Sequence, residues 1–504
     1  MRVIVVGAGS AGATFAGRLA GDGRHEVVLV EAGPDHGAFA DMQWPFEMLD
    51  SRRIPVTTHD WGLVNQDPGT DRTYPLARAR IMGGCSAHNG CAAVRGVRRD
   101  FERWCEAGGS RLWDPDQVLE DFAAVHRGLN VRTYDAHEIS PFQMDFYHAA
   151  RQAGVPHSAD INDIDEGEGV TLCPVNKKGG VRWNAAFGFI DPVRGRGNLT
   201  IVDNCEVQAL ILDGSRVKGV QGTREGAPVE LLGDRVVLCC GAYHSPMLLM
   251  RSGIGDPALL GEAGIELRHA LPGVGHNLHD HPLMLLEYEG TPSLLARTER
   301  FERHALNHDE CTIAKVRSPY ARDAFDMHIF SVGGRLPDLV GWYWLIAVGL
   351  LDPRSRGRIR PWRKDGALAF AIEHRHVSDR DGVDRAALAW GVAEARRIAG
   401  LEPLASSIRE TKPGPGVQGS GVEAWIEREH LHYYHPAGSC AIGTDPANGA
   451  VVDAAGRVHG LDGLMIADAS IMPFVTTANT NLPAAMIGHR LARLFDEIAT
   501  VSGA

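Results

Sequence analysis

The sequence contains no apolar stretch long enough to cross a lipid bilayer. Its longest apolar run, residues 339–351, has thirteen residues, whereas a membrane-spanning helix needs about twenty. We interpret this run as a buried strand and expect no membrane span. The chain starts directly on the strand-like residues 3–6, without the charged and apolar regions of a secretory signal. A cytoplasmic location is therefore predicted.

An excess of positive charge is also missing. The 51 basic and 63 acidic side chains give a formal net charge of −12, and an acidic surface repels phosphate backbones, so nucleic acid is not an expected partner. The nine cysteines form no repeated C-x-x-C pair, which predicts neither a disulfide framework nor a zinc site. His276, His279 and His281 do not have the spacing of helical metal ligands, and no metal is expected.

Glycine, in contrast, is abundant, with 59 of 504 residues where about 7% is usual. Three glycines, Gly7, Gly9 and Gly12, follow the apolar residues 3–6 and open a helical pattern. A dinucleotide-binding β-α-β unit needs glycine at these places for the tight turn, the pyrophosphate and the helix packing. Glu31 follows the second strand, where a carboxylate accepts hydrogen bonds from ribose hydroxyls. This motif predicts a dinucleotide without separating FAD from NAD.

Strand-like patterns recur far along the chain and indicate two interleaved domains. The apolar run 235–240 resembles a return to the first sheet, and residues 367–372 alternate as in an antiparallel sheet. The sequence therefore predicts an α/β fold class, α+β in its division into two domains. The domains are a Rossmann-like dinucleotide-binding domain of residues 1–155, 195–284 and 425–504, and an antiparallel-sheet, substrate-binding cap of residues 156–194 and 285–424.

Further regions of the chain are rich in glycine and small polar residues. Residues 80–90 contain the Gly83-Gly84 pair, which lets the backbone approach a flat ring system, and residues 241–255 and the segments around His435 and Asn481 follow. In this order, these regions resemble the glucose-methanol-choline (GMC) family of FAD-dependent oxidoreductases, from residue 3 to about residue 495. The resemblance implies bound FAD, a two-domain fold and the oxidation of a primary or secondary alcohol.

The resemblance also implies which residues bind FAD. They are Gly7, Gly9, Ser10, Gly12, Glu31, Ala32, Gly83, Gly84, Ser86, His88, Asn89, Val207, Asp468, Ala469 and Asn479. Two roles are open for His88: a hydrogen bond to a phosphate or ring edge, and a covalent bond to the 8α-methyl carbon of the flavin. One family member with a similar segment carries that covalent bond, and the resemblance favours it.

Catalysis is assigned to His435. A base with a pKa near neutrality is suited to accept a hydroxyl proton as hydride leaves carbon. In similar family members this position carries the active-site histidine, with a histidine or asparagine beside it that holds the substrate oxygen. The resemblance gives that second role to Asn481, although Asn479 lies two residues earlier. Tyr434 precedes the base and is expected to lie near the substrate.

The substrate and the final electron acceptor stay open at this point. Molecular oxygen is slightly favoured over a quinone or another acceptor. The same family contains hydroxynitrile lyases, whose FAD does no net redox chemistry, so a lyase is a second function class. The first glycine loop alone would also fit a NAD-dependent dehydrogenase, which does not explain the C-terminal segments. The expected partner is a small-molecule alcohol, and a homo-oligomer is left open.

Overall fold

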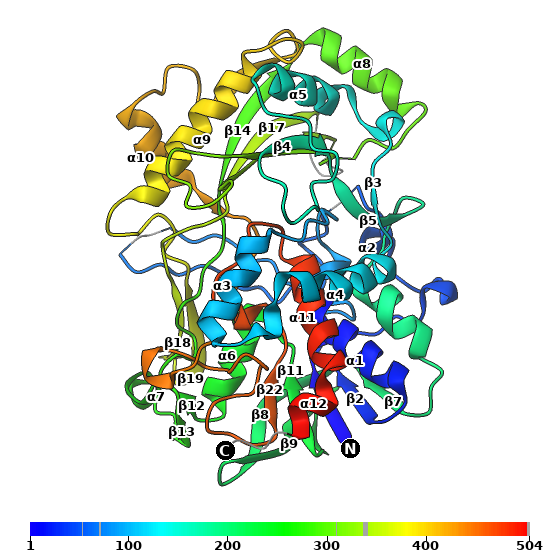
Figure 1. Ribbon diagram of the computed structural model, residues 1–504, viewed down its shortest axis with the longest axis vertical. Coiled ribbons are helices and arrows are strands. Elements are labelled where there is room, and N and C mark those ends of the chain that lie inside the picture. The colour runs from blue at the N-terminus through cyan, green and yellow to red at the C-terminus, as the bar shows by residue number, and fades with distance from the viewer. Residues whose placement is uncertain (53, 70–71, 309, 336–340, 501–504) are drawn as a thin grey trace.

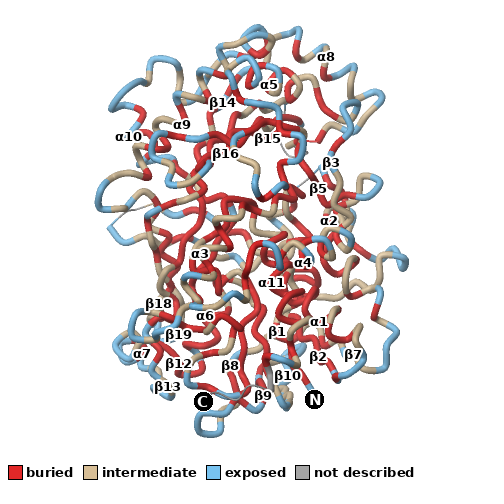
Figure 2. The backbone as a smooth tube through the Cα atoms, in the orientation of Figure 1, coloured by how far each residue is buried: buried red, intermediate tan, exposed pale blue. Residues whose placement is uncertain are grey.

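The computed structural model describes residues 1–504 except 53, 70–71, 309, 336–340 and 501–504. Two bodies are stacked along the long axis of the molecule (Figure 1). We call the lower body, which holds the N-terminus, the nucleotide domain, and the upper body the cap. Figure 2 shows buried chain inside both bodies and in the region where they meet.

A parallel sheet forms the centre of the nucleotide domain. Its order is β22-β11-β1-β2-β7, and each pairing is parallel. The strands are β1 (Arg2–Val6), β2 (Glu26–Val30), β7 (Leu199–Val202), β11 (Arg235–Leu238) and β22 (Leu464–Ile466). Both faces of a parallel sheet are covered, so its strands are apolar throughout. The predicted β-α-β start and the return of the chain near residue 235 are confirmed.

Helices pack around this sheet. α1 packs against α11, and α11 packs against α4. The helices are α1 (Ser10–Asp22), α2 (Phe46–Leu49), α3 (Arg98–Gly108), α4 (Pro115–Gly128), α6 (Gly241–Arg251), α7 (Pro257–Glu262), α11 (Asn481–Arg493) and α12 (Phe495–Thr500). Short 3-10 and π turns are η1 (Phe39–Asp41), η2 (Gly84–Ala87), η3 (Arg111–Trp113), η4 (Ala136–Glu138), η5 (Ala186–Ile190), η6 (Asp191–Val193), η7 (Pro446–Asn448) and η8 (Ala469–Ile471).

The remaining strands outside the cap sheet form four smaller sheets. They pair in the orders β10-β9-β8, β12-β13, β18-β19 and β3-β5-β6. Their bounds are β3 (Val131–Thr133), β5 (Pro174–Lys178), β6 (Val181–Arg182), β8 (Cys205–Asp213), β9 (Arg216–Arg224), β10 (Ala227–Leu232), β12 (Ile254–Gly255), β13 (His269–Ala270), β18 (Arg358–Lys364) and β19 (Ala367–Glu373).

The cap is built on an antiparallel sheet. Its order is β20-β14-β17-β16-β15-β4, and β21 pairs with β14. The strands are β4 (Gly169–Leu172), β14 (Pro282–Gly290), β15 (Thr312–Val316), β16 (Met327–Gly334), β17 (Tyr343–Leu350), β20 (Ile408–Lys412) and β21 (Leu431–His432). The strand predicted at residues 339–351 corresponds to β17, whereas residues 339 and 340 lie outside the described residues.

Successive side chains of a strand point to opposite faces of the sheet, which gives the cap sheet two different faces. On β16, Met327 and Ile329 join the core with the cap helices, whereas Phe330 clusters with Tyr433 and Ala478. The helices are α5 (Pro141–Gln152), α8 (Pro292–Glu302), α9 (Val383–Ala399) and α10 (Ser420–Glu429). The Phe330 face of the cap sheet therefore forms a roof over the nucleotide domain.

The packing shifts the domain boundaries that the sequence predicts. α5 contacts β4, β15 and β16, so residues 141–152 pack with the cap although the predicted first segment runs to residue 155. η5 contacts α1 and α4, so part of the predicted cap segment 156–194 packs on the nucleotide domain. The β18-β19 hairpin contacts α6 and α7 and also joins that domain. Each element buries its apolar face against the nearest core, whatever its place in the sequence.

Three further findings concern the predicted absences. No described helix has the length and apolar character that a membrane span requires. The nine cysteines are free thiols. Within the described part of the chain, no three His, Cys, Asp or Glu side chains are grouped so that they could hold a metal ion.

A buried charge cluster joins α4 to α11. The fully buried Asp121 carboxylate accepts hydrogen bonds from His489 Nδ1 at 2.8 Å, Arg490 Nη1 at 2.6 Å and Arg493 Nε at 3.0 Å. Burial alone would raise the pKa of Asp121, but these donors hold it well below its usual range. The carboxylate is therefore charged and ties together two helices of the nucleotide domain.

We expect Asp121→Asn to destabilise the protein by about 3–5 kcal/mol, because Arg490 would stay buried without its counter-charge. Thermal unfolding at neutral pH should show a clearly lower Tm. Since the folded-state pKa of Asp121 is depressed, its contribution is present above the unfolded-state pKa and is lost as the pH falls through the folded-state pKa. The control is Asp116→Asn on the same helix, whose side chain is 74% exposed. Equal Tm values for the two variants would contradict this role of the cluster.

Candidate active site

The turn between β1 and α1 contains two close backbone contacts. Gly7 has a φ of +94°, and a Cβ on it would lie 2.5 Å from the carbonyl oxygen of Cys239. A Cβ on Gly12 would lie 1.8 Å from the carbonyl oxygen of Gly7. α1 begins at Ser10, and the N-cap residue Gly9 provides no side-chain hydrogen bond. The first N–H groups of α1 are therefore available to an anion, as a pyrophosphate site requires.

A second glycine loop lies directly against the first. Gly84 begins η2 with a φ of +50°, and a Cβ on it would lie 2.6 Å from the Cα of Gly9. The Ser86 hydroxyl donates to the carbonyl of Gly83 at 2.6 Å and stabilises this turn. Two segments about 75 residues apart thus meet at backbone contact distance, and they come together where the sequence places the cofactor.

Glu31 lies beside the first glycine loop, immediately after β2. Its carboxylate oxygens accept the backbone N–H groups of Ala8 at 2.8 Å and Gly33 at 2.9 Å. Burial raises the pKa of Glu31 to about 7, although these hydrogen bonds lower it. Each oxygen keeps a lone pair for a ribose hydroxyl. The neighbouring Ala32 carbonyl accepts a hydrogen bond from Arg80 Nε at 3.2 Å.

The other predicted cofactor residues lie at the ends of strands and helices. The buried Asp468 carboxylate accepts the Gly241 N–H at 2.9 Å and the Ser245 hydroxyl at 2.6 Å. It therefore fixes the start of α6, and a contact with FAD stays a prediction for Asp468 and Ala469. Val207 lies in β8, where the register with β9 shifts.

His88 follows η2 and has a buried, neutral ring. Burial and the charges of Arg78 and Arg182 lower its pKa to about 3. Its Nδ1 has no hydrogen-bond partner among the described residues. Arg182 donates to the carbonyls of Ala87 at 3.2 Å and Asn89 at 2.8 Å. This arginine therefore fixes the backbone on both sides of His88.

His435 is buried where the roof of the cap meets the nucleotide domain. Its Nδ1 lies 2.9 Å from Nδ1 of His281, and its Nε2 lies 3.3 Å from Nδ2 of Asn479. Because an amide nitrogen donates and does not accept, Nε2 of His435 carries the lone pair. Nδ1 of His435 then carries the proton and donates a hydrogen bond to Nδ1 of His281. Burial and His281 hold the pKa of His435 well below its usual range, so the ring is a neutral base.

The structure does not place Asn481 beside the base, contrary to the expectation from the sequence. α11 begins at Asn481, and its Oδ1 accepts a hydrogen bond from the Ser10 hydroxyl at 2.7 Å. Asn479 precedes the helix and reaches His435. Because α11 begins at Asn481, Asn479 lies beside His435 and Asn481 lies beside Ser10. We move the role beside the base from Asn481 to Asn479, and Asn481 joins the first glycine loop.

Tyr434 lies at the surface beside the base. It is 45% exposed and has a φ of +63°, an uncommon conformation for tyrosine. Its carbonyl accepts a hydrogen bond from Arg78 Nη1 at 3.2 Å, and its ring centroid is 4.1 Å from that of His432. Contact with substrate stays a prediction for Tyr434. The buried ring of Tyr433 lies 4.3 Å from the His435 ring.

The sequence analysis missed a cluster of buried imidazoles around the base. His281 precedes β14, His328 lies on β16, and His374 follows β19. His328 is fully buried, and neither of its ring nitrogens has a partner within the described chain. These residues come from separate strands, so no spacing in the sequence connects them. The signal that was present is the Asp280-His281 pair directly before the apolar strand β14.

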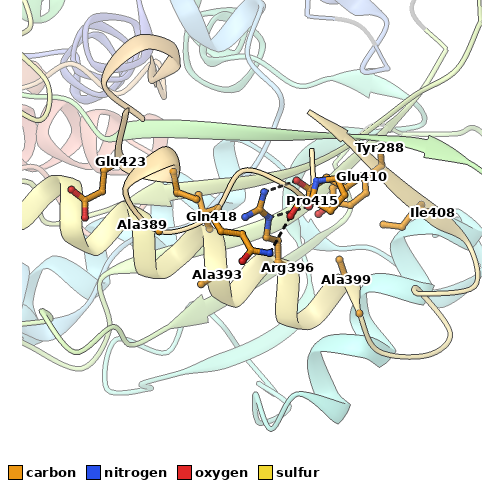
Figure 3. A pocket seen from close by; sticks show the side chains of 14 residues that line it. Tyr288, Ala389, Ala393, Arg396, Ala399, Ile408, Glu410, Pro415, Gln418 and Glu423 are labelled. Atoms are coloured by element: carbon orange, nitrogen blue, oxygen red, sulfur yellow. Dashed lines mark hydrogen bonds and ion pairs between the residues drawn. The ribbon is translucent and has the colours of Figure 1, made fainter. Parts of the chain in front are cut away.

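A hollow lies on the helix-covered face of the cap, away from the roof. It is a groove of roughly 700 Å³ between α9, α10 and β20. Figure 3 shows Arg396 held by Glu410, with contacts of 3.0 Å and 2.7 Å. Its described lining contains neither histidine nor cysteine. The groove therefore offers no acid–base chemistry comparable with that of His435.

The residues around the two glycine loops fit FAD. A Cβ on Gly9 would meet nothing closer than the Gly84 Cα, at 3.9 Å, so the space in front of Gly9 is open. Buried polar atoms are normally paired, yet Asn481 Nδ2, His88 Nδ1 and Asn479 Oδ1 have no partner among the described residues. Phosphate oxygens, ribose hydroxyls and a polar ring would supply such partners.

Comparison with known proteins decides the family. Models of the N-terminal and C-terminal parts of GMC oxidoreductases match residues 1–283 and 353–488. The chain belongs to the GMC oxidoreductase family. It is 31% identical to an oxygen-dependent choline dehydrogenase of Chromohalobacter salexigens and 30% identical to choline oxidase of Arthrobacter globiformis, each over 97% of this chain and 93% of the relative.

Solved structures show the same fold. The crystal structure of pyridoxine 4-oxidase from Mesorbium loti has a TM-score of 0.86 at 28% identity, covering 98% of this chain and 99% of that one. Formate oxidase has a TM-score of 0.84 at 21% identity, covering 98% of both chains. The predicted two-domain fold is confirmed. This GMC oxidoreductase is a FAD-dependent enzyme of the alcohol-acting class.

We expect Gly84→Ala to abolish stable FAD binding in the GMC enzyme, because a methyl group 2.6 Å from the Gly9 Cα would force the two loops apart. The measurement is the ratio of flavin to protein absorbance after purification. The matched control is Gly195→Ala, whose Cβ would meet nothing within 4 Å. A Gly84→Ala protein as yellow as the wild type would contradict the assigned cofactor site.

Proposed function

We propose that this GMC enzyme oxidises a small alcohol to an aldehyde or ketone and passes the electrons to molecular oxygen. FAD, when bound, supplies the acceptor for a hydride. The observation that carries the proposal is the pair of His435 Nε2 and Asn479 Nδ2, 3.3 Å apart. An alcohol oxygen in front of both atoms would give its proton to Nε2 and accept a hydrogen bond from Nδ2. This arrangement suits the activation of a hydroxyl group.

The protonation state of His435 also favours this chemistry. Burial holds its pKa well below the ordinary value of 6.5, so the ring is unprotonated in the free enzyme at neutral pH. The base therefore needs no prior loss of a proton. Its Nδ1–H points to His281, which keeps the ring in the orientation that turns Nε2 toward Asn479.

The names of the relatives support the acceptor and suggest the first substrate to test. They include an oxygen-dependent choline dehydrogenase, a choline oxidase and a pyridoxine 4-oxidase. We therefore propose oxygen as the acceptor and a compact alcohol as the substrate, with choline as the first compound. The cytoplasmic location stays a prediction, and a homo-oligomeric assembly stays open.

We expect His435→Ala to lower turnover by about 10²- to 10⁴-fold, as removal of a general base does, while FAD is still bound. Asn479→Ala should cost less, because it removes a hydrogen-bond donor and leaves the base. The measurement is oxygen consumption with a panel of primary and secondary alcohols, with an artificial electron acceptor in parallel.

Asn481→Ala is the control for these variants, because the Asn481 side chain accepts a hydrogen bond from Ser10 in the first glycine loop and, among the described residues, forms none with His435. It should affect FAD retention and leave turnover per bound flavin nearly unchanged. The proposal fails if His435→Ala turns over like the wild type at neutral pH. It also fails if no alcohol is oxidised with either acceptor.

We further propose that FAD is attached covalently through the His88 ring. A ring nitrogen would bond to the 8α-methyl carbon, the methyl group would lose a proton, and the flavin left reduced by this step would give its two electrons to oxygen. The buried ring is neutral and its Nδ1 has no partner in the described residues, as a nucleophilic imidazole requires. After acid precipitation we expect yellow colour in the washed wild-type pellet. His88→Ala should release its flavin into the supernatant, as a control with free FAD does. A colourless wild-type pellet would exclude the covalent bond.

A further inference from the structure

Asp280 has a buried carboxylate oxygen without a hydrogen bond. Asp280 precedes β14 and is 1% exposed. Its Oδ1 accepts the backbone N–H of His435 at 3.0 Å. Its Oδ2 has no hydrogen-bond partner in the described part of the chain, and Nδ1 of His432 is 3.8 Å away. Burying an unpaired charged oxygen costs free energy. We therefore ask which function of Asp280 could offset that cost.

The groups that face Asp280 come from all the segments packed around it. Six imidazoles lie within electrostatic reach: His279, His281, His374, His376, His432 and His435. Tyr74, Tyr243, Tyr434 and Arg78 complete the surroundings. Burial lowers the pKa of His374 to about 3 and that of His281 to about 4. These two rings are therefore neutral, and Arg78 is a permanent positive charge near Asp280.

Asp280 is charged in this setting. Burial would raise the pKa of Asp280, but His432 is the largest opposing influence, and the balance lies well below the usual range. His432 Nε2 lies 3.0 Å from the carbonyl oxygen of Pro75, and a carbonyl accepts hydrogen bonds without donating. Nε2 of His432 therefore carries a hydrogen and donates it in a hydrogen bond to the Pro75 carbonyl. When one of the neighbouring imidazoles gains a proton, its positive charge balances the negative charge of Asp280.

We propose that Asp280 is a positioning residue that serves as the buried counter-ion of His435 while His435 holds the proton of the alcohol. This inference rests on the alcohol oxidation proposed above. In that step the O–H proton moves to His435 Nε2, the C–H bond breaks with its electron pair leaving as hydride to FAD, and a C=O bond forms. His435 becomes a cation in a region that excludes water, and the carboxylate bonded to its own backbone N–H stabilises that cation.

The charge of Asp280 also has a defined effect on the pH dependence. Burial and His281 lower the pKa of His435, whereas the Asp280 charge raises it and the Arg78 charge lowers it. Removing the Asp280 charge therefore lowers that pKa. Since the base works unprotonated, the acid limb of the kcat/KM profile should move to lower pH. The maximal rate should fall, because the protonated ring is less stable.

A purely structural role for Asp280 must be separated from this electrostatic one, since Oδ1 also holds the backbone at His435. Asp280→Asn keeps an acceptor oxygen and removes the charge. We would measure the rate at which alcohol bleaches the flavin under anaerobic conditions, in a double-mutant cycle with His435→Ala. We expect Asp280→Asn to slow bleaching on the order of tenfold or more in the wild-type background, and by less than about twofold when His435 is absent.

Several controls keep this test decisive. Asp384→Asn removes a buried carboxylate that accepts the Arg354 and Ser355 N–H groups, away from the imidazoles, and should leave the bleaching rate unchanged. If Asp280→Asn fails to fold, Asp280→Ser also removes the charge and keeps an acceptor.

The outcomes separate the two proposals. Equal slowing in both backgrounds, or an acid limb that stays in place, overturns the role of Asp280 alone. A wild type that no alcohol bleaches overturns the proposed function itself.

Discussion

Two buried imidazoles that face each other through their Nδ1 atoms have to share one proton. In this enzyme the rings are those of His435 and His281, 2.9 Å apart, and Asn479 can only donate to the other nitrogen of His435. The proton is thereby placed on Nδ1 of His435 and the lone pair on Nε2. His281 directly precedes β14 and His435 follows β21, which are both strands of the cap sheet, whereas Asn479 precedes α11 of the nucleotide domain. The base is therefore complete when the two domains are packed together.

The glycine loops bring the cofactor site to the same region. Gly84 lies so close to the Gly9 backbone that the second loop cannot carry a larger residue at this position. His88 follows the second loop, and Asn481 meets Ser10 at the start of α1. The segment from Asn479 to Asn481 thus contacts the base at one end and the first glycine loop at the other. Three residues of chain therefore join the proposed base to the proposed cofactor site.

The sequence predicted the nucleotide domain well because its determinants are local. Gly7 and Gly12 are required by backbone contacts within one β-α-β unit, and a short motif records them. Asn479 and Asn481 have identical side chains, so the choice between them depends on where α11 begins. α11 packs against α1, and this tertiary contact is not contained in any local pattern.

The roof of the cap was not predictable for a related reason. Asp280 and His328 come from segments that the cap sheet brings together, whereas His374 follows the separate β18-β19 hairpin. Each of the three looks like an ordinary buried residue in the sequence. The domain boundaries shifted for the same cause, since α5 and η5 pack where their apolar faces find a partner core. Tertiary contacts decide both the residues that meet under the roof and the domain boundaries. The individual segments carry no signal for either.

The central claim is that His435 removes the hydroxyl proton as the substrate gives a hydride to FAD. Anaerobic mixing of the yellow enzyme with an excess of an accepted alcohol, unlabelled or deuterated at the carbinol carbon, tests it most directly. The account predicts that the visible flavin absorption bleaches, that deuterium slows the bleaching, and that His435→Ala slows it by about 10²- to 10⁴-fold. A flavin spectrum that stays unchanged while the substrate is consumed would contradict the account, because the reaction would then be a non-redox cleavage.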